Sequence, residues 1–268
     1  MANYQLGVIG AGNMAEALLR GAIGANVLDH NAVVASDPVF DRRQWFTREL
    51  GVTTAEVNIV PAACPYILLA VKPQVMGEVL AGIAGDVADD AVVISIAAGV
   101  RTAWIGERLS GKGRIVRVMP NTPMLVGAGV SALCKGPGAT DADLAWAQRL
   151  FAACGGTVRV DEPMIDAVTA VSGSGPAYFF YLIEAMVAAG EAEGLAEDVA
   201  LRLAVETCRG AGELLVRTAE APKVLRAKVT SPGGTTQAAI ESMEAAGVSD
   251  ALVAAVRRAA ERSRELGK

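Results

Sequence analysis

The sequence predicts an α/β fold in which a doubly wound parallel sheet forms the N-terminal part and helices alone form the C-terminal part. Short runs of Val, Ile and Leu alternate with helical segments through the first half of the chain, which is typical of a parallel sheet covered on both faces. After the strand-like residues 157–160 this alternation stops, and from Met164 onward the chain is rich in alanine with helical spacing. We therefore expect two domains, residues 1–162 and residues 163–268.

The expected strands share one feature, since each of the first five is followed within three residues by Gly, Pro or Asp. They cover residues 4–9, 32–35, 66–71, 91–96 and 114–118, with a sixth at 157–160. Parallel neighbours need crossover connections, which are right-handed and usually helical. The first crossover helix is expected over residues 16–23.

The C-terminal part is expected to contain four main helices, over residues 177–194, 197–217, 235–246 and 249–266. The first of these carries apolar residues over a surface too broad for a half-exposed helix. We therefore expect this helix to be buried, and such burial in a small domain suggests a partner subunit.

Length, composition and charge exclude several other classes of protein. The 268 residues suffice for about one large or two modest domains. Hydrophobic residues make up 52% and charged residues 20%, which excludes a disordered or fibrous chain. The 24 Lys and Arg residues against 29 Asp and Glu residues give a net charge of −5, so there is no basic footprint for nucleic acid.

Cysteine spacing and the apolar segments indicate the compartment. The four cysteines contain no Cys-x-x-Cys pair, so we expect neither a zinc site nor a disulfide framework, and no metal. Residues 1–5 lack the basic region of a signal peptide. The longest apolar runs fall far short of the ~20 residues that span a bilayer. We therefore expect a cytoplasmic protein without a membrane partner.

A glycine-rich turn follows the first expected strand and opens the first helix, with the sequence Gly10-Ala11-Gly12-Asn13-Met14-Ala15. In this context the first glycine permits the tight turn and the second lets a pyrophosphate approach the backbone. The small third residue lets helix and strand pack closely, and the helix N-terminus faces the phosphates. The turn predicts a Rossmann-type, dinucleotide-binding domain, against the alternative of an ordinary tight turn.

The choice of dinucleotide stays open at the end of the second strand. Asp37 lies where an acidic side chain would bond a ribose 2′-hydroxyl, which favours NAD. Ser36, Arg42 and Arg43 could instead receive a 2′-phosphate, which favours NADP. The arginines have an alternative interpretation as a solvated face at the start of a helix.

A second candidate site is the segment Thr230-Ser231-Pro232-Gly233-Gly234-Thr235-Thr236, which opens a helix. Backbone N–H groups at such a helix start can hold a carboxylate. The alternative, simpler on local grounds, is a helix capped by Ser231 or Thr235 after a proline turn.

The remaining motifs are structural or exclude particular chemistry. Residues 172–177, Ser-Gly-Ser-Gly-Pro-Ala, form a glycine-rich break that favours close packing, with Pro176 in the first turn of a helix. Residues 119–123 form a rigid turn at the carboxyl end of a strand, where open α/β sheets bind ligands. The lone histidine, His30, is remote from all these turns, so an enzyme here would work by positioning and hydride transfer.

These motifs together resemble the pyrroline-5-carboxylate reductase family. The resemblance covers essentially the whole chain and rests on five segments in the family's order and spacing, at residues 10–15, 70–74, 118–123, 172–178 and 230–236. The Ser-Pro-Gly-Gly-Thr-Thr helix start is highly specific, so it favours the anion-binding interpretation over the capped helix. A β-hydroxyacid dehydrogenase would carry a lysine in the helix at 177–194, which has none. A nucleotide sensor without catalysis would have no use for Thr235 and Thr236.

The resemblance implies reduction of the cyclic imine 1-pyrroline-5-carboxylate to L-proline, the last step of proline biosynthesis, by NADPH or by NADH. It implies that backbone N–H groups of Gly234, Thr235 and Thr236 bind the substrate carboxylate. The Thr236 hydroxyl would hydrogen-bond the ring nitrogen, which makes Thr236 the catalytic residue. Glu162 matches a family position near the substrate.

The resemblance also implies a set of cofactor contacts in the turns that follow the strands. These are Gly10, Ala11, Gly12, Asn13, Met14, Ser36, Asp37, Asn58, Ala70, Val71, Lys72, Pro73, Ala97, Ala98 and Gly99. Two residues depart from the family pattern: Asp37 stands where many NADPH-preferring members have serine, and Lys228 where several relatives have asparagine. The helical domain would pair two subunits into a homodimer, and five dimers could form a decamer. The active site could then combine the Rossmann domain of one chain with the Thr236 helix of the other.

Overall fold

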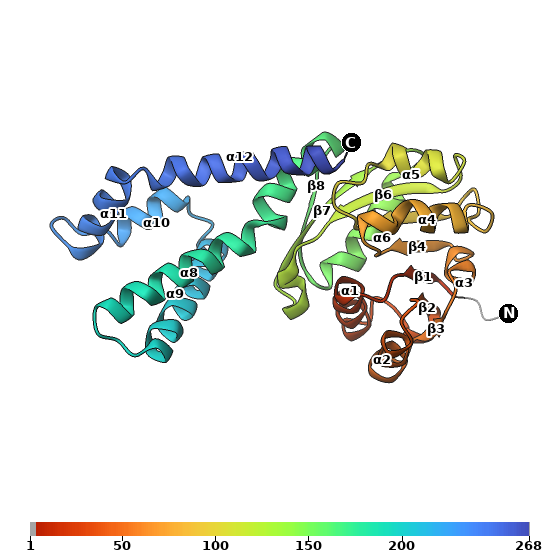
Figure 1. Ribbon diagram of the computed structural model, residues 1–268, viewed down its shortest axis with the longest axis horizontal. Coiled ribbons are helices and arrows are strands. Elements are labelled where there is room, and N and C mark those ends of the chain that lie inside the picture. The colour runs from red at the N-terminus through yellow and green to blue at the C-terminus, as the bar shows by residue number, and fades with distance from the viewer. Residues whose placement is uncertain (1–3, 268) are drawn as a thin grey trace. The chain divides into compact units, whose positions relative to one another are not determined.

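The computed structural model describes residues 4–267 and divides the chain into two compact units (Figure 1). The first unit contains the described residues as far as Gly173, together with residues 259–267. The second unit contains residues 174–258. The first unit carries the sheet, and the second is helical.

The sheet of the first unit has eight strands in the order β3-β2-β1-β4-β5-β6-β7-β8. Their bounds are β1 Leu6–Ile9, β2 Val33–Ser36, β3 Thr53–Ala55, β4 Tyr66–Leu69, β5 Val92–Ser95, β6 Arg114–Met119, β7 Gly129–Lys135 and β8 Gly155–Arg159. The first six strands are parallel. This is the doubly wound order in which the chain turns back between β1 and β4, and the predicted fold class is confirmed.

The sheet differs from the expectation at its last two strands. β7 runs antiparallel to β6, and β8 pairs parallel with β7. Neither β7 nor β3 is predicted by the sequence. β3 is a three-residue strand with partly exposed residues, and β7 mixes Gly, Ser and Ala with its larger apolar residues, so both lack a continuous apolar run.

Helices cover both faces of the sheet. They are α1 Asn13–Gly24, α2 Phe40–Leu50, α3 Ile59–Ala62, α4 Pro73–Ile83, α5 Thr102–Arg108, α6 Asp141–Ala152 and α7 Ile165–Val168, with short 3-10 turns at His30–Ala32, Thr122–Val126 and Glu162–Met164. Because side chains alternate along a strand, Leu68 packs into one core cluster and its neighbours Ile67 and Leu69 into the other. The two clusters fix the sheet between its helices.

The second unit is helical, as predicted. It contains α8 Gly175–Ala192, α9 Glu197–Thr218, α10 Pro222–Lys228, α11 Thr235–Ala245 and most of α12 Val248–Leu266. α8 and α9 pack closely, because a Cβ added at Gly190 would lie 3.0 Å from the Cβ of Ala200. The short helix α10 is not predicted by the sequence. None of the helices in the described part of the chain is long and apolar enough to cross a membrane.

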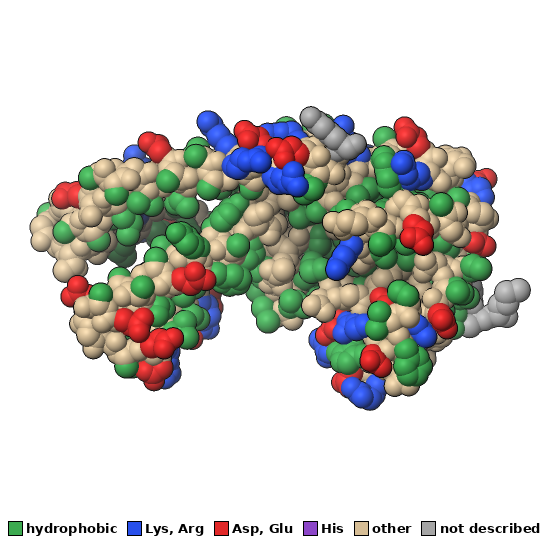
Figure 2. Space-filling model, viewed as in Figure 1, with side chains coloured by type: hydrophobic (Ala, Val, Ile, Leu, Met, Phe, Trp, Pro, Cys, Tyr) green, Lys and Arg blue, Asp and Glu red, His purple; other side chains and the backbone are tan. Residues whose placement is uncertain are grey.

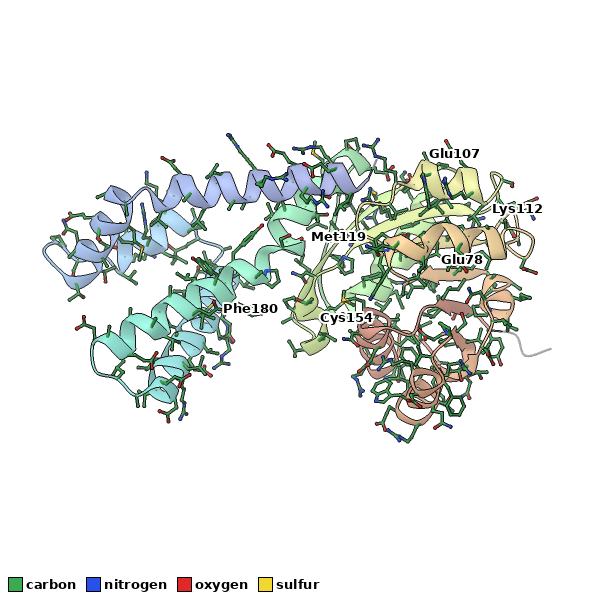
Figure 3. The ribbon with its side chains drawn as sticks, in the orientation of Figure 1. Glu78, Glu107, Lys112, Met119, Cys154 and Phe180 are labelled. Carbon is green, nitrogen blue, oxygen red and sulfur yellow. The ribbon has the colours of Figure 1, made fainter. Side chains whose placement is uncertain are left out.

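Helix α8 is exposed within its own chain, although the sequence predicts its burial. Phe179 is 57% exposed, Phe180 60% and Tyr181 75%. Hydrophobic side chains lie open on the surface of this helix, and Phe180 is labelled on it (Figures 2 and 3). An apolar helix of this kind has its contact surface available for another chain.

Candidate active site

The glycine-rich turn between β1 and α1 has the geometry of a phosphate site. Gly10 has φ +99°, and a Cβ there would lie 2.8 Å from the carbonyl oxygen of Ala70, so only glycine fits. Gly12, the N-cap of α1, is exposed, and a Cβ added there would meet no atom within 4 Å. Ala15 is fully buried, which lets α1 pack on the sheet. The turn therefore leaves open space in front of the first N–H groups of α1.

Asp37 lies directly beside this turn. Its Oδ2 accepts a hydrogen bond of 2.9 Å from the backbone N–H of Ala11, and its Oδ1 accepts one of 2.9 Å from the N–H of Val39. The carboxylate is thus fixed at the carboxyl end of β2, next to the expected phosphate site. This is the place where an acidic side chain meets the adenosine ribose in Rossmann domains.

The two arginines near Asp37 are both engaged with the protein. Arg42 donates from Nε to the carbonyl of Ala11 at 2.8 Å and from Nη2 to Glu16 at 2.9 Å. Arg43 donates to the carbonyl of Asp37 at 2.8 Å and lies 3.7 Å from a carboxylate oxygen of Glu56. These contacts are more specific than those of a solvated face, and both guanidinium groups face acidic side chains.

Ser36 and Asn58 form a pair beneath the end of β2. Ser36 is fully buried, and its hydroxyl donates to Oδ1 of Asn58 at 2.7 Å. Asn58 is the N-cap residue of α3. In this arrangement the Ser36 hydroxyl points to Asn58, so a 2′-phosphate would not meet it without a change of partner.

The turn after β4 lies next to the glycine turn, because β1 and β4 are neighbours. The N–H of Ala70 donates to the carbonyl of Ile9 at 2.9 Å. Lys72 is the N-cap of α4 and Pro73 its first residue, a position that proline favours. The two turns thus flank the point where the order of the strands reverses, which is where open α/β sheets bind ligands.

The loop after β5 is buried. The N–H of Ala97 donates to the hydroxyl of Ser95 at 3.3 Å. Gly99 has φ +76°, and a Cβ there would lie 3.3 Å from Leu266 in the last turn of α12. The hydroxyl of Ser263, one turn earlier, donates to Asp166 at 2.6 Å. The end of α12 therefore supports this loop.

Glu162 makes contacts within the protein through both carboxylate oxygens. Oε1 accepts from the N–H of Thr102 at 2.8 Å, and Oε2 accepts from the hydroxyl of Thr102 at 2.6 Å. Arg117, only 4% exposed, donates to Oε1 at 3.2 Å. Burial raises the pKa of the nearby Cys134 thiol to about 11, and the negative charge of Glu162 adds to this effect.

The helix start at Thr235 is open at its N-terminus. Gly234 is the N-cap, with extended φ −84° and ψ 171°, and it offers no side chain to the N–H groups of the first turn. Thr236 is half-buried. The helix capped by Ser231 or Thr235 is therefore not what the structure shows. The N–H of Gly234 already donates to the carbonyl of Ser231 at 3.0 Å, and the first bond within the helix runs from Ala238 to Gly234. The N–H groups of Thr235, Thr236 and Gln237 therefore have no acceptor within the helix.

The segment 169–173 departs from α-helical geometry and forms a π-helical turn. Asn121 donates from Nδ2 to the carbonyl of Ser172 at 3.2 Å and accepts from the N–H of Val130 at 2.8 Å. A Cβ at Gly173 would lie 2.7 Å from the methyl group of Met119, which Figure 3 labels at the end of β6. Gly173 therefore packs closely against β6, but a Cβ added at Gly175 would meet no atom within 4 Å, so close packing accounts for the first glycine of this break and not for the second.

Sequence reasoning missed two residues that bear on the site, namely Thr102 and Arg117, whereas Asn121 lies in the turn at residues 119–123 that the sequence had already indicated. Arg117 alone had a visible signal, because a charged residue within an apolar strand needs a buried partner. The described residues contain no group of three or more His, Cys, Asp or Glu side chains that could hold a metal ion.

A Rossmann sheet with this glycine turn defines the class of dinucleotide-binding proteins. Residues 162–266 match a family model described as pyrroline-5-carboxylate reductase dimerisation, and residues 5–99 match one described as NADP oxidoreductase, coenzyme F420-dependent. The chain is 40% identical to the pyrroline-5-carboxylate reductase of Methanosarcina acetivorans, with 100% of both chains covered. It is 40% identical to that of Arabidopsis thaliana, with 99% of this chain and 96% of the relative covered.

Solved structures agree with the sequence relatives. A pyrroline-5-carboxylate reductase from Coxiella burnetii has a TM-score of 0.93 at 34% identity, with 99% of each chain covered. The Plasmodium falciparum pyrroline carboxylate reductase, solved with NADP bound, has a TM-score of 0.88 at 30% identity, with 100% of each chain covered. The chain belongs to the pyrroline-5-carboxylate reductase family, so the resemblance drawn from the motifs is confirmed.

Proposed function

We propose that this chain carries out the reaction of its family, the reduction of 1-pyrroline-5-carboxylate to L-proline, through the turns of the first unit and the helix start at Thr236. One observation carries the proposal. A glycine turn with open space at Gly12 and a helix start without a side-chain cap at Gly234 occur in the same chain, and both kinds of site are suited to anions.

The residues of the first unit fit a nicotinamide dinucleotide. The open space at Gly12 and the exposed Asn13 accommodate a pyrophosphate at the start of α1. The residues that would hold the cofactor are Gly10, Ala11, Gly12, Asn13, Met14, Ser36, Asp37, Asn58, Ala70, Val71, Lys72, Pro73, Ala97, Ala98 and Gly99. When bound, the nicotinamide supplies the hydride. We propose NADPH as the donor with NADH also used, because the matched model of residues 5–99 describes an NADP oxidoreductase while Asp37 favours a free ribose hydroxyl.

The start of α11 is the proposed substrate site. The N–H groups of Thr235 and Thr236 bind the substrate carboxylate, and Gly234, which has no side chain, leaves room for its approach. The Thr236 hydroxyl hydrogen-bonds the ring nitrogen and fixes which face of the imine is presented. This differs from the sequence expectation at one donor only, because the N–H of Gly234 is bonded to Ser231.

The chemistry requires orientation more than proton transfer. A protonated imine is already electrophilic at carbon, and addition of hydride gives the neutral amine without a strong general acid. A reacting carbon held within about 3–3.5 Å of the hydride donor gains most of the rate advantage available from positioning. Thr236 supplies this orientation by bonding the ring nitrogen next to the reacting carbon.

The apolar surface of α8 supports assembly as a homodimer. Phe179, Phe180 and Tyr181 are exposed in the single chain, and the matched dimerisation model covers this helix. In the proposed dimer, the Rossmann domain of one chain and the Thr236 helix of the other contribute to one active site, and dimers could assemble further into a decamer.

We also propose a cytoplasmic location, which the four free cysteines support.

Coupled ligand binding separates this function from nucleotide sensing without catalysis. Calorimetric titration of L-proline into the protein, with and without saturating NADP+, measures whether the two sites are linked. A reductase binds proline, and its affinity depends on the bound nucleotide. If the protein binds NADP+ but shows no binding of proline in either titration, it is a sensor and the proposed reaction is wrong.

A further inference from the structure

The loop between β5 and α5 is a part of the proposed cofactor site whose support comes from elsewhere in the chain. It runs from Ile96 to Arg101, and α5 begins at Thr102. Arg101, the N-cap residue of α5, makes no side-chain capping bond to the helix. The position of the loop at its helix end therefore depends on what holds Thr102.

Glu162 takes the role that a local N-cap side chain would have at the start of α5, because it accepts hydrogen bonds from Thr102. Its two oxygens accept from the backbone N–H and from the hydroxyl of Thr102, at 2.8 Å and 2.6 Å, although the residues are 60 positions apart. A carboxylate at the N-terminus of a helix is stabilised by the first N–H groups, so this contact is favourable in both directions. A Cβ at Gly136 would lie 2.4 Å from the Cβ of Thr102, so the backbone of Gly136 encloses the threonine on another side.

Arg117 fixes Glu162 in turn. Its guanidinium lies on β6, is 4% exposed, and donates to Oε1 of Glu162 at 3.2 Å. A buried guanidinium without a carboxylate partner is strongly unfavourable, so the pair constrains the position of both side chains. Three donors from two residues thus converge on the carboxylate of Glu162.

A second pair on the same strand has the same chemistry at a different place. Arg114, three residues before Arg117 on β6, donates to both oxygens of Asp143 at 2.8 Å and 3.0 Å. Asp143 also accepts from the N–H and the hydroxyl of Thr140, the N-cap of α6. Each pair therefore joins β6 to the start of a helix, but the loop that leads into α6, residues 136–140, contains none of the proposed cofactor residues.

We propose that Glu162 is a positioning residue for the cofactor, which acts through Thr102 on the loop 97–101 and does not contact the imine substrate. The proposal rests on the assignment of this loop to the cofactor site. It is supported by the contacts of the carboxylate, because Thr102 and Arg117 occupy three of its roughly four acceptor positions. Loss of the negative charge releases the loop and weakens cofactor binding, while the imine site at Thr236 is unchanged.

The test compares Glu162→Gln with Asp143→Asn as the matched control. The Kd of NADP+ is measured by calorimetry on the intact protein, and the KM of the imine is measured separately at saturating cofactor. We expect the Kd of NADP+ to rise about tenfold in Glu162→Gln, as for the loss of one bond to a charged group. In the control, Asp143→Asn, the Kd of NADP+ stays within twofold of its value in the unaltered protein. This comparison is informative because each variant loses an ion pair with an arginine of β6 and a contact to a threonine at the start of a helix.

Thr102→Val provides a second variant if Glu162→Gln folds poorly. It keeps the N–H but removes the hydroxyl, so we expect a smaller rise of the same Kd. Hydrogen exchange at the amides of residues 97–101 should accelerate in both variants and not in the control. A raised imine KM with an unchanged Kd of NADP+ would show that Glu162 contacts the substrate, and an unchanged Kd and exchange rate would refute its positioning role. Failure of the unaltered protein to bind NADP+ would instead refute the proposed function.

Discussion

Replacement of Asp37 by serine should shift the cofactor preference toward NADPH. In the structure the carboxylate is fixed by the N–H groups of Ala11 and Val39, both at 2.9 Å, so its charge has a defined place beside the glycine turn. A 2′-phosphate brought to this place meets a negative charge, whereas the 2′-hydroxyl of NADH can donate to it.

The magnitude follows from charge and hydrogen bonding. Two unit charges roughly 8 Å apart interact by about 2 kcal/mol at an effective dielectric of 20, and screening by salt reduces this to about 1 kcal/mol. Loss of a ribose hydrogen bond costs NADH about 0.5–1.5 kcal/mol. The two effects together change the ratio of kcat/KM for NADPH and NADH by about 10- to 100-fold, since every 1.4 kcal/mol is tenfold.

The assay measures kcat/KM for each cofactor at a fixed, saturating imine concentration in Asp37→Ser and in the unaltered protein. Asp29→Ser is the matched control, because Asp29 accepts from the N–H of Asn31 as Asp37 does from that of Val39, and the change in net charge is the same. The control should leave the ratio unchanged. A ratio that is also unchanged in Asp37→Ser, or that moves toward NADH, refutes the assignment of Asp37 to the ribose site.

Two further predictions concern assembly and stability. Phe180→Glu places a charge on the exposed apolar surface of α8, so sedimentation should show dissociation of the dimer, and an unchanged mass would exclude this surface from the interface. Burial raises the pKa of Asp143, but hydrogen bonds from Arg114 and Thr140 outweigh this effect and hold it below the usual 3.8. Its contribution to the free energy of unfolding is therefore complete above about pH 4 and is lost as the pH falls through the lowered pKa. Asp143→Asn should reduce this acid dependence in urea unfolding measured from pH 6 to pH 3, and an identical slope would contradict it.

The fold was predictable where the signal is local. Apolar runs that end in turn residues locate five of the six parallel strands, and the change to helical spacing near Met164 identifies the helical part. The strand β7 was not predictable, because Gly, Ser and Ala interrupt the apolar run by which the other strands are identified. The short elements β3 and α10 have too few residues for a periodic pattern.

The predicted burial of α8 illustrates a second limit of prediction from sequence. Its sequence correctly indicates an apolar surface, yet Phe180 is 60% exposed in the single chain. The hydrophobic pattern of a helix indicates that its apolar surface is buried in the functional protein. It does not indicate whether that surface packs against the same chain or against another one. The homodimer proposed above would reconcile the predicted burial with the observed exposure.

The motifs of the candidate site were predictable from the sequence, whereas the contacts between its side chains were not. The glycine turn at Gly10 and the helix start at Thr235 are local features, and the structure has both. The bonds of Glu162 to Thr102 and Arg117 join residues 60 and 45 positions apart, which no spacing rule connects. The pairing of Ser36 with Asn58 has the same origin, since it depends on how α3 packs beside β2.

The most direct test of the account is the initial rate of nicotinamide oxidation with 1-pyrroline-5-carboxylate, measured with NADPH and NADH in parallel for the unaltered protein and Thr236→Val. We expect rapid turnover of the unaltered protein. The variant should turn over several-fold more slowly, with the cofactor Kd unchanged, because one hydrogen bond worth about 0.5–1.5 kcal/mol is lost, or more if it strengthens in the transition state. Absence of turnover with either cofactor would contradict the proposed reaction, and equal turnover in Thr236→Val would remove this hydroxyl from the mechanism.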